Sequence, residues 1–428
     1  MYSVVISNGV FRFHLVSAAV EAARRGTLEL FLTGAYPKGP LSAFLKKWLG
    51  NSPAARRLVD RADNGLSESN IVSVWCAEFV IQAGVTLGGL LKSRATNDRL
   101  QALGLSVYGR IAARAIRGAS SDIYHYRAGY GGRSIEIARS SGAVCLCDHS
   151  VVSPLTLDYM VSNSGQLPPT DMLSSIRLSA MWKTVLDDIE AADHVLVNSQ
   201  LVKSTLMHHG VPGETITVIY QGIDAKFLQS IPAARPVKAT KTLLFAGEIA
   251  RRKGFDSLIA ALGGIPEDEW ELIVAGGTNE TTEAEYRRFL LRPNVRHVGF
   301  VSRTELARLM SESAIFVFPT LAEGSARVIF EAMACECYVI TTPNAGSIVE
   351  TGRHGELIQP GDVAGLRDAI RRALTSSTTA EIGARNGRLI REEYMQSDYG
   401  VQLDGLYQDL VDGRKALRRR IPEEASAT

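Results

Sequence analysis

One stretch of the chain, residues 314–350, constrains the fold more than any other. It begins with the apolar, β-rich segment Ala314–Phe318, which predicts a buried strand. The loop Glu323-Gly324-Ser325 follows, and then apolar residues at helical spacing. A second strand is predicted over Tyr338–Thr341, and the turn at 343–346 is expected to open a second helix. Two successive strand–loop–helix units predict a parallel sheet, in which ligands bind at the carboxyl ends of the strands.

The two loops of this stretch carry chemistry that suits a bound anion. Both are expected to open helices, whose free N–H groups favour a phosphate. The first loop also presents two carboxylates, Glu323 and Glu331, which are eight positions apart. One lies in the loop and the other about two turns into the helix, so both can face one side of a cleft.

The flanking residues extend this pattern into a recognisable motif. Glu323-Gly324 opens it, and Glu-Ala-Met-Ala at residues 331–334 closes it. This motif resembles the donor-binding motif of the retaining glycosyltransferases of family 4, of the bacterial polysaccharide and glycolipid type. These enzymes have the GT-B fold and use nucleotide sugars. The resemblance is strong from about residue 192 to 361 and diffuse before that.

The resemblance implies an α/β fold of two Rossmann-like domains that face each other across a cleft. Since 428 residues are enough for two domains, length agrees with it. We expect an acceptor-binding domain over residues 1–230 and a donor-binding domain over residues 231–393. A proline-containing linker joins them at 230–241. A C-terminal helix at about 394–420 is expected to cross back to the first domain.

Charge is distributed unevenly along the chain. The formal net charge is +2, yet residues 1–150 hold 18 Lys and Arg against 10 Asp and Glu. A basic first domain favours an anionic partner such as a membrane surface, although solvated surface charge explains it equally well. Residues 41–49 have the pattern of a membrane-surface helix and also that of a helix packed on the domain core, which we prefer.

Targeting signals and cysteines point to a reducing compartment. No secretory signal is visible, and the longest apolar run, Phe79–Leu91, is too short to span a bilayer. We therefore expect a cytoplasmic enzyme, with peripheral contact at the inner membrane face. The five cysteines include two C-x-C pairs, at 145/147 and 335/337, which we interpret as buried apolar residues rather than a zinc site.

The first domain offers three candidate site residues, each at the end of a predicted strand. Gly9 follows the strand over residues 4–6, where the family places a glycine-rich loop near the sugar and the acceptor. Two further strands end near His125 and His149. The resemblance implies a histidine that faces the sugar at this point. His149 matches best, and His125 is the second choice.

The segment Gly247–Gly254, GEIARRKG, is the candidate site for the donor diphosphate. A diphosphate leaving group needs its charge neutralised as the glycosidic bond breaks. Lys253 precedes a predicted helix, where its ammonium group and free N–H groups can converge. The family typically has an arginine after the first glycine, but Glu248 stands there. Arg252 or Arg251 is therefore expected to supply that charge.

The resemblance gives the two glutamates different roles. Glu331 is expected to accept hydrogen bonds from the ribose hydroxyls. Glu323 is expected to hold the sugar hydroxyls or to stabilise developing positive charge. The backbone N–H groups of Gly324, Ser325, Ala326 and Arg327 are expected to bind sugar or phosphate. The alternative is that both glutamates cap the helix start and pair with arginines.

The expected activity is transfer of a sugar from a nucleotide diphosphate sugar to a glycan, glycolipid or lipid-linked acceptor, with retention of configuration. Glu323, His149 and Lys253 form the expected catalytic set. No Asp-x-Asp motif is present, so we expect no metal and no cofactor, and nothing indicates a nucleic-acid partner. Two alternatives remain open: a nucleotide-sugar epimerase on the same fold, and a catalytically silent subunit that binds nucleotide sugars.

Overall fold

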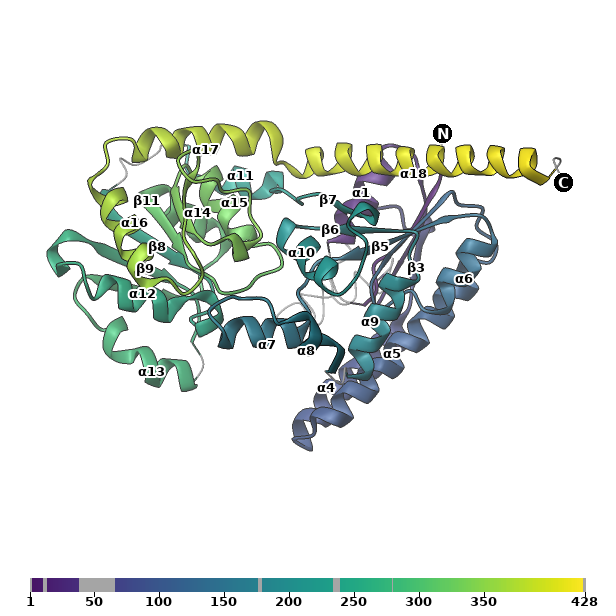
Figure 1. Cartoon of the computed structure of the whole chain (residues 1–428), viewed down its shortest axis with the longest axis horizontal. Helices are drawn as coiled ribbons and strands as arrows, with labels where there is room; N and C mark the ends of the chain where they lie inside the picture. Colours follow the sequence, from purple (N-terminus) through teal and green to yellow (C-terminus); the bar gives the residue numbers. More distant parts are fainter. Residues whose placement is uncertain are drawn as a thin grey trace.

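The computed structural model describes residues 2–10, 14–37, 66–175, 179–233, 239–278 and 280–425. Within these ranges the chain forms two parallel sheets, each flanked by helices (Figure 1). The strand order is β3-β2-β1-β4-β5-β6-β7 in the first sheet and β10-β9-β8-β11-β12-β13 in the second. This confirms the predicted α/β fold of two Rossmann-like domains.

The first domain supplies the seven-stranded sheet and its covering helices. Its strands are β1 (Val4–Ser7), β2 (Leu28–Thr33), β3 (Ile71–Ser73), β4 (Ile123–Arg127), β5 (Val144–His149), β6 (His194–Val197) and β7 (Ile216–Val218). Its helices are α1 (Leu15–Arg24), α4 (Trp75–Leu90), α5 (Arg94–Ala115), α6 (Arg133–Ser140), α7 (Pro154–Ser162), α8 (Thr170–Ser175), α9 (Ala180–Glu190) and α10 (Gln200–His208). The next helix, α11 (Ala225–Ser230), packs in the core of the second domain through Phe227.

The second domain supplies the six-stranded sheet. Its strands are β8 (Ala239–Ala246), β9 (Glu271–Ala275), β10 (Val295–Gly299), β11 (Ser313–Phe318), β12 (Tyr338–Thr341) and β13 (Gly355–Leu357). Its helices are α12 (Phe255–Leu262), α13 (Glu280–Leu290), α14 (Arg303–Glu312), α15 (Arg327–Ala334), α16 (Val363–Thr375) and α17 (Thr379–Glu393).

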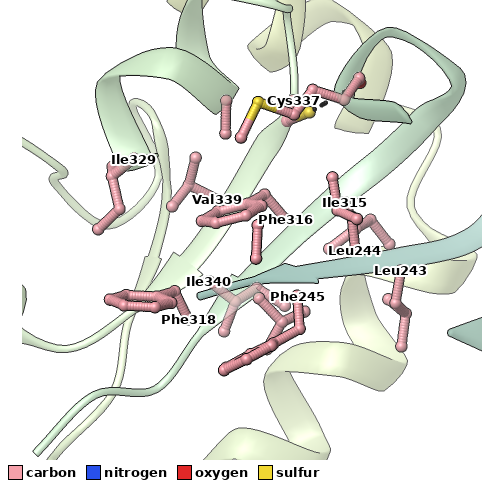
Figure 2. Close-up of a cluster of buried hydrophobic side chains, with 14 of the residues drawn as sticks. Leu243, Leu244, Phe245, Ile315, Phe316, Phe318, Ile329, Cys337, Val339 and Ile340 are labelled. Carbon is pink, nitrogen blue, oxygen red and sulfur yellow. Dashed lines mark hydrogen bonds between the residues drawn. The ribbon is translucent and has the colours of Figure 1, made fainter. Parts of the chain in front are cut away.

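The strands at the centre of the second sheet are fully buried. All six residues of β11 are buried, as expected for a central strand covered on both faces. Figure 2 shows Leu244, Phe316 and Val339, from three adjacent strands, packed together in this core. Burial of each such side chain contributes about 2 kcal/mol. The rigid centre fixes where the loops at its carboxyl edge begin.

The last helix, α18 (Gln396–Ala425), crosses from the second domain to the first (Figure 1). Tyr399, Leu403 and Tyr407 join the buried core of the first domain. The Tyr407 hydroxyl hydrogen-bonds His125 Nδ1 at 2.6 Å. The predicted crossing helix is therefore confirmed, and its side chains are part of the first domain's interior.

One expected element is wrong. The turn at Pro343–Ala345 forms only a short 3-10 helix, and the next α-helix begins at Val363. Gly346 follows at a φ of 59°, in the left-handed region that ends a helix. The Asn344 side chain also donates to the carbonyls of Leu321 at 2.8 Å and Gly165 at 2.7 Å. The turn therefore links the two domains instead of starting a helix.

Other sequence expectations have simpler outcomes. The helix expected over residues 41–49 lies outside the described residues. Cys145, Cys147, Cys335 and Cys337 are buried, as expected. Burial raises the pKa of the Cys145 thiol to about 12. Nowhere in the described ranges is there a cluster of three or more His, Cys, Asp or Glu arranged to hold a metal ion. Among the helices of those ranges, none has the length and apolar character needed to cross a bilayer.

Candidate active site

A cavity of about 360 Å³ opens at the carboxyl edge of the second sheet. This is where parallel α/β sheets bind ligands, and the volume suits a small molecule. Its wall includes six of the predicted residues: Lys253, Glu323, Ser325, Ala326, Arg327 and Glu331. The structure thus brings the two predicted donor loops together around one space.

Glycines hold the loop after β8 in place on one side of this cavity. A Cβ at Gly276, in the loop after β9, would overlap the carbonyl of Gly247, in the loop after β8. These two loops therefore touch through their backbones. Gly254 has a φ of 75°, and a Cβ there would overlap the carbonyl of Pro319. This close approach turns Lys253, just before α12, toward the Glu323 loop.

Glu323 is the centre of an ion cluster. Arg252 donates to Glu323 Oε1 at 2.5 Å, and the Lys253 ammonium donates to the same oxygen. Burial lowers the pKa of Lys253, and the Glu323 carboxylate opposes that shift. Arg251, in contrast, is two-thirds exposed and lies 4.0 Å from Asp256. Arg252 is therefore the arginine of this loop that reaches the site.

Glu331, on the second turn of α15, lies in a second ion cluster. Its Oε1 atom is 3.0 Å from Arg303 and 3.5 Å from Arg327 Nε. Both arginines also pair with Asp224, and the Arg303 bond is 2.9 Å long. Burial raises the pKa of Glu331, and the two arginines oppose that shift. Arg303 and Asp224 were not predicted from the sequence, because pairing across three separate segments leaves no local pattern.

Both glutamates pair with arginines, as the alternative interpretation of the motif expected. The loop backbone also differs from expectation. The Ala326 N–H donates to the Ala345 carbonyl at 2.8 Å, and the Arg327 N–H donates to the Ser325 carbonyl at 3.0 Å. These two N–H groups are already hydrogen-bonded and do not point free into the cavity. Within the described residues, no hydrogen bond is recorded for the N–H groups of Gly324 and Ser325.

The first domain meets this loop next to His149. A Cβ at Gly324 would overlap the carbonyl of Ser150, and the Ser199 hydroxyl donates to the Gly324 carbonyl. His149 is buried at the end of β5, with its ring edge-on to Trp182 at 6.2 Å. Burial and the nearby Arg127 lower the pKa of His149 to about 3. Its imidazole is therefore neutral at physiological pH, and it lies beside the cavity rather than in its wall.

Asp148 gathers a buried polar cluster in the first domain that our sequence analysis did not identify. The carboxylate lies 2.7 Å from His14, 3.3 Å from Arg127 and 3.7 Å from His125. Although burial raises the pKa of Asp148, these neighbours hold it far below its usual range. His125 is fully buried and bonded to Tyr407 of α18. The second-choice histidine is thus part of the core and not of the cavity.

Gly9 has a structural role in the turn after β1. Its φ is 78°, and a Cβ there would lie 2.6 Å from the Tyr130 ring. Its N–H donates to the Tyr108 hydroxyl at 3.1 Å. The structure does not bring Gly9 into the cavity wall with the residues of the second domain.

The second domain carries the chain's match to a known protein family. Residues 240–376 match the family model of the glycosyl transferases group 1. The glycogen synthase of Mycobacterium tuberculosis is 32% identical over 193 residues, which are 44% of this chain and 45% of that protein. The capsular polysaccharide biosynthesis glycosyltransferase CapM of Staphylococcus aureus is 28% identical over 171 residues, or 38% of this chain and 44% of that protein. The match spans just under half the length of each of these relatives.

A solved structure extends the similarity to the whole fold. The Anabaena protein HepE, in complex with UDP and glucose, aligns with a TM-score of 0.59 at 16% identity. The alignment covers 96% of this chain and 100% of that one. At this identity the likeness supports the fold alone, which is that of two-domain GT-B glycosyltransferases.

Proposed function

Because residues 240–376 carry the sequence pattern of the group 1 glycosyl transferases, we propose that this chain transfers a sugar from a nucleotide diphosphate sugar to an acceptor. We further propose that it does so with retention of configuration, as in family 4. The observation that carries the proposal is the cavity itself, where cations stand at Glu323 and a buried carboxylate stands at Glu331.

The first cluster is suited to a diphosphate. Lys253 and Arg252 both point at the Glu323 carboxylate, and a donor diphosphate would compete for the same two cations. Their charge would then stabilise the leaving group as the glycosidic bond breaks. Glu323, released from its partners, would accept hydrogen bonds from the sugar hydroxyls. We propose that these residues meet the diphosphate charge without a metal or a cofactor.

The second cluster is suited to a ribose. Glu331 is mostly buried, and an ionised carboxylate only accepts hydrogen bonds. Two ribose hydroxyls would replace part of its contact with Arg303. The N–H groups of Gly324 and Ser325 remain the backbone donors for the sugar or phosphate, since those of Ala326 and Arg327 are paired.

The first domain would complete the site when a donor is bound. His149 is held neutral, so its ring can exchange a hydrogen bond with a sugar hydroxyl without carrying charge. We propose a glycan, glycolipid or lipid-linked acceptor at the inner membrane face. The basic character of residues 1–150 supports that part of the proposal.

The test is thermal unfolding with a panel of nucleotides and nucleotide sugars, with wild type and Glu331→Ala in parallel. A ligand bound only by the folded protein adds about 2.7 kcal/mol of stability at a hundred times its dissociation constant. We expect a shift with one base family that the variant loses. Absence of a shift with every nucleotide would remove the basis for a donor site.

One observation favours a second candidate, a catalytically silent subunit that binds nucleotide sugars. Glu248 lines the cavity where the family resemblance implies a cation, and it adds negative charge beside the diphosphate position. Such a protein would bind the nucleotide but show neither transfer nor slow donor hydrolysis. Product analysis with donor alone, and with donor plus an acceptor extract, separates the two functions.

A further inference from the structure

Helix α4 in the first domain carries two opposite stripes of residues. Ala77, Ile81, Gly84 and Gly88 are buried, at spacings of four, three and four. The stripe on the other side consists of five exposed residues at the same helical spacing: Trp75, Phe79, Gln82, Thr86 and Leu90. A surface helix normally exposes charged residues on its outer face, but this stripe carries none.

Three of the five side chains in this stripe are large and apolar, and the other two, Gln82 and Thr86, are polar but uncharged. Phe79 and Leu90 are each 76% exposed, and Leu91 is 65% exposed. Residues 79–91 contain no charged residue at all. The Thr86 hydroxyl donates to the Gln82 carbonyl at 3.0 Å, so its polar group is satisfied within the helix. Val85 and Leu87, on the same helix, are also 49% and 45% exposed, and such a gathering of exposed apolar side chains usually marks a binding surface.

The helix is held rigidly on a projecting hairpin. α4 and α5 pack closely because glycines remove the side chains between them: a Cβ at Gly84 would lie 2.7 Å from Leu100, and one at Gly88 would lie 2.6 Å from Asn97. In Figure 1 the hairpin slants down from the first domain, and its tip projects below α8 at the lower edge of the molecule. The exposed stripe is therefore presented at a free end of the molecule.

Cations stand at the end of the same hairpin. Lys92, in the turn after α4, and Arg99, on α5, are both exposed. The nearest acidic residue on α5, Asp98, accepts hydrogen bonds from the Ala180 and Met181 N–H groups at the start of α9, at 2.9 and 3.3 Å. The hairpin end thus combines an uncharged apolar face with exposed positive charge.

We propose that the outer stripe of α4 inserts into the surface of an anionic lipid bilayer, with Lys92 and Arg99 at the headgroups. A helix of 16 residues is about 24 Å long, so it would lie along the interface and not cross it. The positive charge complements anionic headgroups and would repel a second copy of the same basic hairpin. This inference does not rest on sugar transfer, because it concerns binding to lipid alone.

The test is co-flotation of the full chain with vesicles, either of phosphatidylcholine alone or of phosphatidylcholine with phosphatidylglycerol. We expect wild type to bind the anionic vesicles at low salt. The double variant Phe79→Ser/Leu90→Ser should bind about 100-fold more weakly, because two large apolar side chains no longer leave water. Lys92→Glu should weaken binding about tenfold on anionic vesicles only.

The matched control is Leu291→Ser/Val401→Ser. Leu291 is 72% and Val401 is 62% exposed, and both lie on other helices or their ends, so this variant should float as wild type does. Wild type that stays with the unbound fraction, or a Phe79/Leu90 variant that floats equally well, would overturn the proposal. The variant Leu45→Ser/Trp48→Ser changes residues 41–49, the other segment with a membrane-surface pattern. If this variant loses binding while the Phe79/Leu90 variant keeps it, the proposal is also overturned. A wild-type dimer that the Phe79/Leu90 variant converts to a monomer would assign the face to a second copy instead.

Discussion

The two domains place their charged groups differently at the edges of their sheets. In the second domain, Lys253, Glu323 and Glu331 line a cavity that a ligand can enter, although Glu331 is itself buried. In the first domain, Asp148 and Arg127 lie at the carboxyl edge of the sheet too, but both are buried. Similar chemistry is thus available to a ligand on one side of the molecule and enclosed by protein on the other.

This difference separates charge that serves binding from charge that serves stability. An ion pair that lines a cavity can exchange one partner for an entering ligand of the same charge, so neither group is left uncompensated. A buried pair cannot lose one member without leaving an uncompensated charge. Substitutions in the Lys253 and Glu323 cluster should therefore change ligand binding and turnover. Substitutions in the Asp148 and Arg127 cluster should change the stability of the fold.

The largest effect is expected from Lys253→Ala. Without the ammonium group that faces the diphosphate position, kcat/KM for the donor should fall about 1000-fold, or about 4 kcal/mol. The melting temperature should change little. Arg251→Ala is the control, because Arg251 is exposed and turned toward Asp256. Equal loss of activity in both variants would contradict the assignment of Lys253.

Asp148→Asn should give the opposite result, with loss of stability first. It removes the buried negative charge that faces His14, Arg127 and His125, so the free energy of unfolding in urea should fall by about 3 kcal/mol. Asp187→Asn makes the same substitution in the exposed pair with Lys183 and should cost no more than about 0.5 kcal/mol. If both variants lost a similar free energy of unfolding, the proposed difference between the two domains would be wrong.

Gly324→Ala tests the contact between the domains. A methyl group there would overlap the carbonyl of Ser150, so the loop and the first domain must move apart. Because a shift of about 1 Å in a site can cost about 100-fold in rate, transfer should fall by that factor while nucleotide binding persists. Gly405→Ala, which meets nothing within 4 Å, is the control. Unchanged transfer would indicate that the contact is not needed for turnover.

The smallest expected effect is the pH dependence of His149→Gln. The folded protein lowers the pKa of His149 to about 3 from an ordinary value of 6.5. The stability that depends on the neutral ring is fully present above pH 6.5 and is lost as the pH falls toward 3. Between pH 7.5 and 5.5, wild type should lose about 1 kcal/mol more than the variant. Parallel pH profiles in urea unfolding would show that the ring is not held neutral.

Most strands and helices of the second domain could be predicted from the sequence, because each is determined by residues close together in the chain. The strand Tyr338–Thr341 has the predicted bounds, because a short apolar run between two turns is typical of a buried strand. The helix expected after Pro343 was wrong for the opposite reason. What decides that turn is the bond from Asn344 to Gly165, 179 positions away in sequence.

The candidate site could be predicted only where its residues belong to one local motif. Glu323 and Glu331 share one motif, so their approach to a common cavity followed from helix geometry. The partners of Glu331 did not follow, because Arg303 and Asp224 come from other segments. In the first domain, His14, Arg127 and Asp148 come from three separate elements. No spacing in the sequence predicts that they form a cluster.

The crossing of α18 also sets an order of events during synthesis. The core of the second domain uses residues only as far as Ile390. That of the first domain also needs Tyr399, Leu403, Tyr407 and Val411 from α18. As the chain leaves the ribosome, the later domain therefore has all of its core residues before the earlier one does. The half of the protein that is made first is the half that finishes folding last.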